Sequence, residues 1–67
     1  MNKKKNSGHI IKSARLRVGL TQVELADKIG LHPNTIARIE RDVQKPTFST
    51  AKKLANALNL DIKEIPA

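Results

Sequence analysis

Residues 21–40, TQVELADKIGLHPNTIARIE, place the strongest constraint on how this chain can fold. Thr21 precedes Glu24 by three positions, the spacing of a reciprocal capping box at the start of a helix. Gly30 follows the apolar positions of that helix, and glycine readily takes the positive φ at which helices end. Pro33 suits the first position of another helix, where its missing N–H would be unpaired in any case. The segment therefore predicts two short helices joined by a tight turn.

Apolar residues recur at helical spacing on both sides of this segment. The predicted inward positions of a helix before it are Ile11, Ala14, Arg15 and Val18. Those of a helix after it, opened by Thr47 or Ser49, are Ala51, Leu54, Ala55 and Leu58. Hydrophobic residues make up 39% of the chain and are almost all aliphatic, which favours a helical bundle. We expect an all-α fold with a flexible basic arm at residues 1–8 and one domain over residues 9–67.

The chain is strongly basic, with 13 lysines and arginines against 6 acidic residues and a net charge of +7. In so small a domain this imbalance favours a nucleic-acid partner over an anionic membrane or a merely basic soluble protein. There is no cysteine, and no apolar run has the length of a membrane span or signal peptide. We therefore expect a cytoplasmic protein without a membrane partner.

Metal binding and catalysis are not expected. His9 and His32 have no acidic or cysteine partner at ligand spacing, so no metal site is predicted. Most acidic residues have structural assignments, which leaves no carboxylate pair or nucleophile–base pair. We expect no cofactor, no small-molecule ligand and no enzyme activity.

The spacing TQ-x-x-LA-x-x-IG-L from Thr21, followed by TI-x-x-IE from Thr35, resembles the Cro and phage-repressor type of helix-turn-helix domain. The resemblance spans roughly residues 11–65 and implies a compact five-helix bundle that binds DNA. Arg15 lies on the inward stripe of the first helix and needs an acidic partner there. The resemblance implies that this partner is Glu40.

The resemblance also implies that the third helix enters the major groove of double-stranded DNA. The positions that would meet bases are His32, Pro33, Asn34, Ala37 and Arg38. An asparagine can read adenine and an arginine can read guanine, each through two hydrogen bonds, while an alanine can meet a thymine methyl. Pro33 offers only apolar contact where related domains commonly have a polar side chain.

A second set of residues is expected to contact phosphates. Its members are Gln22, Thr35, Arg41, Gln44 and Lys45, together with Lys3, Lys4 and Lys5 of the arm. The arm is equally compatible with a solvated tail. Asp42 stands where related domains usually have glycine, and its charge would face phosphate.

These observations predict a sequence-specific regulator, most simply a repressor from a phage, plasmid or bacterium, that binds operator DNA as a homodimer. Ile62 and Ile65 are the predicted dimer patch, or else they close the core. Two other classes remain open: the DNA-binding antitoxin of a toxin–antitoxin pair, and a protein-interaction module that kept the fold.

Overall fold

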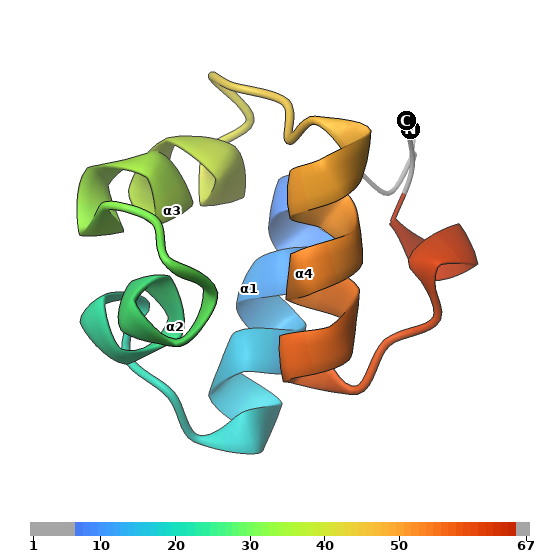
Figure 1. Cartoon of the computed structure of the whole chain (residues 1–67), viewed down its shortest axis with the longest axis horizontal. Coiled ribbons are helices and arrows are strands. Elements are labelled where there is room, and N and C mark those ends of the chain that lie inside the picture. Colours follow the sequence, from blue (N-terminus) through green and yellow to red (C-terminus); the bar gives the residue numbers. More distant parts are fainter. Residues whose placement is uncertain (1–6, 66–67) are drawn as a thin grey trace.

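The computed structural model describes residues 7–65, which form four α-helices and one 3-10 turn (Figure 1). The elements are α1 (Ser7–Val18), α2 (Gln22–Ile29), α3 (Pro33–Glu40), α4 (Phe48–Leu58) and η1 (Ile62–Glu64). The all-α prediction is confirmed, but the expected fifth helix is only the 3-10 turn η1. η1 spans only Ile62–Glu64, three residues, which is less than one full α-helical turn. None of the described helices has the length and apolarity needed to cross a membrane.

The helices pack around one aliphatic core. α1 and α4 lie side by side in the centre of the molecule. α2 and α3 lie together to the left of this pair, and η1 lies to its right, against α4 (Figure 1). The fully buried large side chains are Ile11, Leu25, Ile36, Ile39, Leu54 and Leu58. Ala26 is also fully buried, and its small side chain suits a position where α2 meets α3. One expected core position is wrong: Val18 is 40% exposed, because it stands in the last turn of α1 beyond the packed part of the helix.

The predicted helix ends are present. Thr21 and Glu24 form the reciprocal capping box of α2, with the Thr21 N–H donating to Glu24 Oε1 at 2.8 Å and the Glu24 N–H donating to Thr21 Oγ1 at 3.0 Å. Gly30 has φ 74°, which places it in the left-handed region that glycine takes without steric cost. Of the two candidate caps for α4, Thr47 is the one used.

The first helix begins earlier than the sequence predicted. Ser7 and Gly8 belong to α1 and are buried, so the predicted arm cannot extend to residue 8. The reason is tertiary, because the start of α1 packs against the end of α3. A Cβ on Gly8 would stand 2.4 Å from the carbonyl oxygen of Glu40. Lys3, Lys4 and Lys5 lie outside the described residues.

Candidate nucleic-acid interface

The face of α3 that points away from the core carries the predicted base-reading residues. Ile36, Ile39 and Glu40 form its buried face. On the other side His32, Asn34 and Arg38 are exposed, whereas Pro33 and Ala37 are half-buried. Asn34 and Arg38 are four residues apart, so they occupy adjacent positions on one exposed helix face. The structure thus brings all five predicted residues to the start and outer side of one helix.

His32 also has a structural role at the start of α3. It is the N-cap of α3, and its Nδ1 accepts a hydrogen bond from the Asn34 N–H at 3.1 Å. A neutral imidazole that accepts at Nδ1 carries its hydrogen on Nε2. The cap therefore leaves an N–H donor at the exposed start of α3, where it can meet a base or phosphate acceptor.

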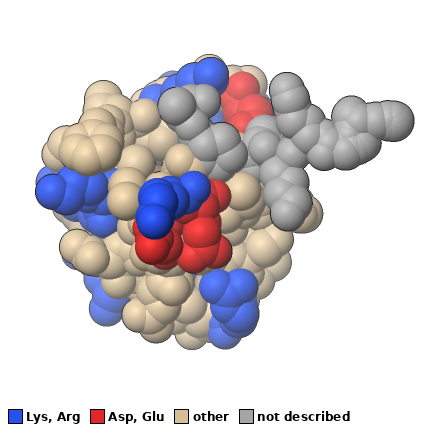
Figure 2. All heavy atoms as spheres, turned by 90° about the vertical axis from the view of Figure 1, so that its right-hand side faces the viewer, with Lys and Arg blue, Asp and Glu red and all other residues tan. Residues whose placement is uncertain are grey.

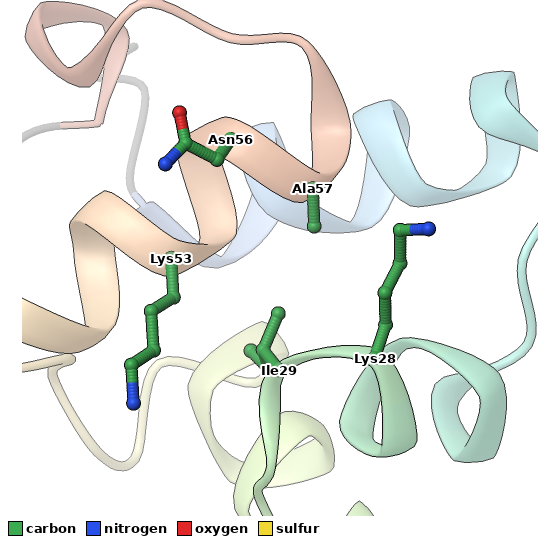
Figure 3. A pocket seen from close by; sticks show the side chains of 5 residues that line it. All are labelled: Lys28, Ile29, Lys53, Asn56 and Ala57. Atoms are coloured by element: carbon green, nitrogen blue, oxygen red, sulfur yellow. The ribbon is translucent and has the colours of Figure 1, made fainter.

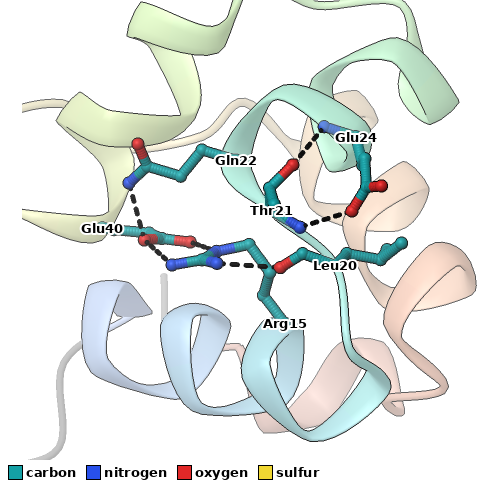
Figure 4. Close-up of polar contacts among 6 residues, drawn as sticks. All are labelled: Arg15, Leu20, Thr21, Gln22, Glu24 and Glu40. Carbon is teal, nitrogen blue, oxygen red and sulfur yellow. Dashed lines mark hydrogen bonds and ion pairs between the residues drawn. The ribbon is translucent and has the colours of Figure 1, made fainter.

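A buried ion pair fixes α3 to the rest of the domain (Figure 4). Arg15 Nε donates to Glu40 Oε2 at 2.7 Å and Arg15 Nη2 donates to Glu40 Oε1 at 3.1 Å, which is the bidentate geometry of strong arginine–carboxylate pairs. Arg15 Nη1 also donates to the Leu20 carbonyl at 2.9 Å. The predicted Arg15–Glu40 pair is confirmed. The hydrogen bond with Glu40 raises the pKa of Arg15, and its attraction to the Glu40 charge acts in the same direction, against the lowering effect of burial.

Gln22 joins this pair, which the sequence did not reveal. Its Nε2 donates to Glu40 Oε1 at 3.0 Å, so α1, α2 and α3 all contribute a side chain to one polar network (Figure 4). A side-chain amide carries two hydrogens. One is bonded to Glu40, and the other remains for a phosphate oxygen at the start of α2.

The other predicted phosphate residues follow α3. Arg41, Gln44 and Lys45 are exposed in the loop between α3 and α4, while Thr35 is half-buried in the first turn of α3. They lie next to the base-reading face along the chain, as a phosphate-contacting rim would require.

Asp42 has a structural role that replaces the expected one. Its φ is 61°, and the N–H groups of Asp42 and Val43 donate to the carbonyls of Ile39 and Arg38 at 3.1 Å each, which is the Schellman ending of a helix. Its Oδ1 accepts a hydrogen bond from the Gly8 N–H at 3.1 Å. The carboxylate thus sits at the positive end of α1, and this interaction opposes the strain of a non-glycine residue at positive φ.

The predicted dimer patch is only partly available. Ile65 is 8% exposed and belongs to the core, and Ile62 packs against that core as a half-buried residue. For Ile65 the alternative interpretation, closing the core, is the correct one. The large exposed apolar side chain nearby is Phe48, which borders a hollow shared with both isoleucines.

Another hollow, of about 420 Å³, lies between α2 and α4 (Figure 3). Ile29 points toward α4 there, and the chains of Lys28 and Lys53 extend away from each other. Asn56 and Ala57 complete its lining, which includes none of the predicted DNA-contacting residues. It is therefore separate from the candidate interface.

Comparison with known proteins identifies the family to which the chain belongs. A family described as Helix-turn-helix matches residues 11–65, and the chain belongs to that family. It is 41% identical over 58 residues to the immunity repressor protein of Bacillus phage phi105; the match covers 87% of this chain but only 40% of that protein. The chain therefore spans about two fifths of the length of this relative.

Solved structures share the arrangement of helices. The DNA complex of SinR, a master regulator for biofilm formation, matches with a TM-score of 0.78 and 30% identity over 84% of this chain and 90% of that one. The P22 c2 repressor bound to a synthetic operator has a TM-score of 0.86 over 90% and 91% of the two chains. Its sequence is 22% identical, so this likeness concerns the fold.

Proposed function

We propose that this protein represses transcription by binding operator DNA sequence-specifically, with α3 in the major groove. The observation that carries the proposal is the exposed Asn34–Arg38 face on a helix whose opposite face is fixed by the core and by Glu40. A rigid helix that presents a polar outer face beside exposed cations fits direct readout combined with phosphate contacts. The immunity repressor and the DNA complex of SinR support the same function.

Within this proposal, Asn34 and Arg38 read base edges, with His32, Pro33 and Ala37 in contact with the groove. Gln22 and the loop residues hold phosphates on both sides of α3, with Thr35 as a further phosphate contact. We place the protein in the cytoplasm, where it has access to DNA, and as a homodimer on two half-sites. One module of this size covers too little DNA for tight specific binding.

The test begins with selection of bound duplexes from a random pool. On the selected site, Asn34→Ala and Arg38→Ala should each weaken binding by about 5- to 150-fold and relax preference at one base position, because each removes a bidentate contact of about 1–3 kcal/mol. Lys12→Ala, which removes an exposed charge on α1, is the control and should leave base preference intact. Selection that yields no preferred sequence for the unaltered protein rules the proposal out and favours a protein-interaction module.

A further inference from the structure

Phe48 is placed unusually for a large aromatic side chain. It stands at the start of α4 with 73% of its surface exposed, more than any other exposed large apolar residue in the described part of the chain. Beside it lies a hollow of about 440 Å³, whose apolar lining is Pro46, Ala51, Ile62 and Ile65. Lys52 covers part of the ring, with Nζ 5.7 Å from the ring centroid. We call Phe48 and this lining the Phe48 surface.

In a two-fold symmetric dimer, the same surface patch of both copies forms the interface. A patch that carries both a projecting ring and a hollow can therefore fit a second copy of itself. We propose that two copies of this chain associate through the Phe48 surface, with Phe48 of each copy entering the hollow of the other. This inference rests on the proposed function, since it names the surface that joins the two DNA-bound copies. It also replaces the predicted Ile62–Ile65 patch with a surface in which both residues form the receiving wall.

The charges around the hollow favour a second copy over other occupants. Lys45 and Lys63 also line the hollow, and the exposed Asp61 and Glu64, which form the capping box of η1, lie within two positions of Ile62 in the chain. Figure 2, which looks at the side bearing η1, shows basic and acidic side chains next to each other on this face. A surface that carries both positive and negative charges can be complementary to the same surface on a second copy of the chain. A nucleic acid or a strongly acidic protein would instead meet Asp61 and Glu64 with like charge.

The surface is small, which sets how strong the association can be. One aromatic anchor and four apolar lining residues on each copy are far fewer than the roughly 20–30 residues a side of standard-size interfaces. Dimerisation of the free protein should therefore be weak. Binding to adjacent half-sites raises the effective concentration of the second copy, so the same contact gives cooperative binding on DNA.

The first experiment measures the oligomer mass of the full chain by sedimentation equilibrium, free at up to millimolar concentration and bound to a duplex with two selected half-sites. Phe48→Ala should raise the dissociation constant of the dimer about tenfold or more, as expected for loss of a central aromatic anchor. Leu16→Ala is the matched control, because Leu16 is a 59% exposed apolar residue on α1 outside the Phe48 surface. An unchanged dimer in Phe48→Ala, or equal weakening in the control, overturns the inference.

The second experiment locates the contact directly. In a mixture of carbon-13-labelled and unlabelled protein, isotope-filtered NOE spectra should connect the ring protons of Phe48 in one copy with the methyl groups of Ile62 in the other. The ring signals are unambiguous because the chain has one phenylalanine and no tyrosine or tryptophan. Intermolecular NOEs from other residues, with none from Phe48, overturn the inference.

Failure of the inference is distinguishable from failure of the proposed function. Binding to a duplex with one half-site depends on α3 and not on the Phe48 surface. Phe48→Ala should therefore bind a single half-site with unchanged affinity and lose only the cooperative gain on two. If the unaltered protein binds single half-sites specifically but remains monomeric on two, the inference is wrong while the proposed function stands.

Discussion

Glu40 connects three helices through one carboxylate. Its two oxygens accept hydrogen bonds from Arg15 on α1 and Gln22 on α2, while its backbone ends α3. The side chains of Arg15 and Glu40 are 9% and 3% exposed. A buried pair of this kind contributes little compared with an apolar pair of equal size, but removing one partner strands the other charge. Glu40 therefore matters most for keeping Arg15 compensated.

Glu40→Gln should lower the free energy of unfolding by about 3 kcal/mol, because it leaves the Arg15 guanidinium buried without an opposite charge. Urea unfolding followed by circular dichroism measures this change. Asp27→Asn, which neutralises an exposed acid on α2, is the control and should stay within about 0.5 kcal/mol of the unaltered protein. Equal stability of Glu40→Gln and the unaltered protein would contradict the role assigned to the pair.

The raised pKa of Arg15 also fixes the sign of its pH dependence. A base whose pKa is higher in the folded state contributes its full stabilisation at every pH below the pKa of the unfolded chain. That stabilisation is lost only as the pH rises through the folded-state pKa, in strongly alkaline solution. Titration of Arg15 therefore has no effect on stability near neutrality.

At the scale of the elements, the start of α1 lies tightly against the end of α3. The carbonyl oxygens of Ile39 and Glu40 would stand 2.7 and 2.4 Å from a Cβ on Gly8. These neighbours are backbone atoms of a packed helix, so they cannot move aside cheaply. Asp42 closes the same junction by accepting the Gly8 N–H. The position of α3 on the domain thus depends on a glycine in another helix.

Gly8→Ala should destabilise the fold by about 2 kcal/mol, since an added methyl group in a packed contact costs about 1–3 kcal/mol. Helix propensity alone predicts the opposite sign, because alanine is the better helix former. Thermal unfolding measures the effect. Ser13→Ala, at an exposed position of the same helix, is the control. A rise in melting temperature for Gly8→Ala would show that the two helices do not meet this closely.

For the whole molecule, the start of α1 determines where residues 1–6 are attached. Ser7 and Gly8 lie beside the end of α3, next to the loop that carries the predicted phosphate residues Arg41 and Gln44. Lys3, Lys4 and Lys5 lie outside the described residues, and we expect them to add phosphate contacts in the proposed DNA complex. Their contribution would be electrostatic and independent of sequence.

Deleting residues 1–6 should reduce the slope of log K against log salt concentration by about 2 to 3, because three lysines release a corresponding number of counterions. The preferred sequence should not change. Fluorescence anisotropy on the selected duplex, over a range of salt concentrations, gives both quantities. A slope equal to that of the full chain would show that Lys3, Lys4 and Lys5 make no phosphate contact.

The local features of this fold were predictable because they depend on residues near each other in the chain. The Thr21–Glu24 box and the left-handed Gly30 depend on residues within four positions of each other, so composition and spacing identify them. The need of Arg15 for an acidic partner was also predictable, because an arginine on the apolar face of a helix requires an opposite charge. These features determine the helix-turn-helix unit and the outer face of α3.

Contacts between residues far apart in the sequence were decided only by the tertiary structure. Gly8 and Asp42 are 34 positions apart, and nothing in either local sequence predicts that one caps the helix of the other. Ile65 and Phe48 are both apolar, yet the first is buried and the second exposed, because burial depends on which surface a neighbouring helix covers. Local sequence specifies helices and their ends; only packing in three dimensions determines which of their side chains remain free to meet another molecule.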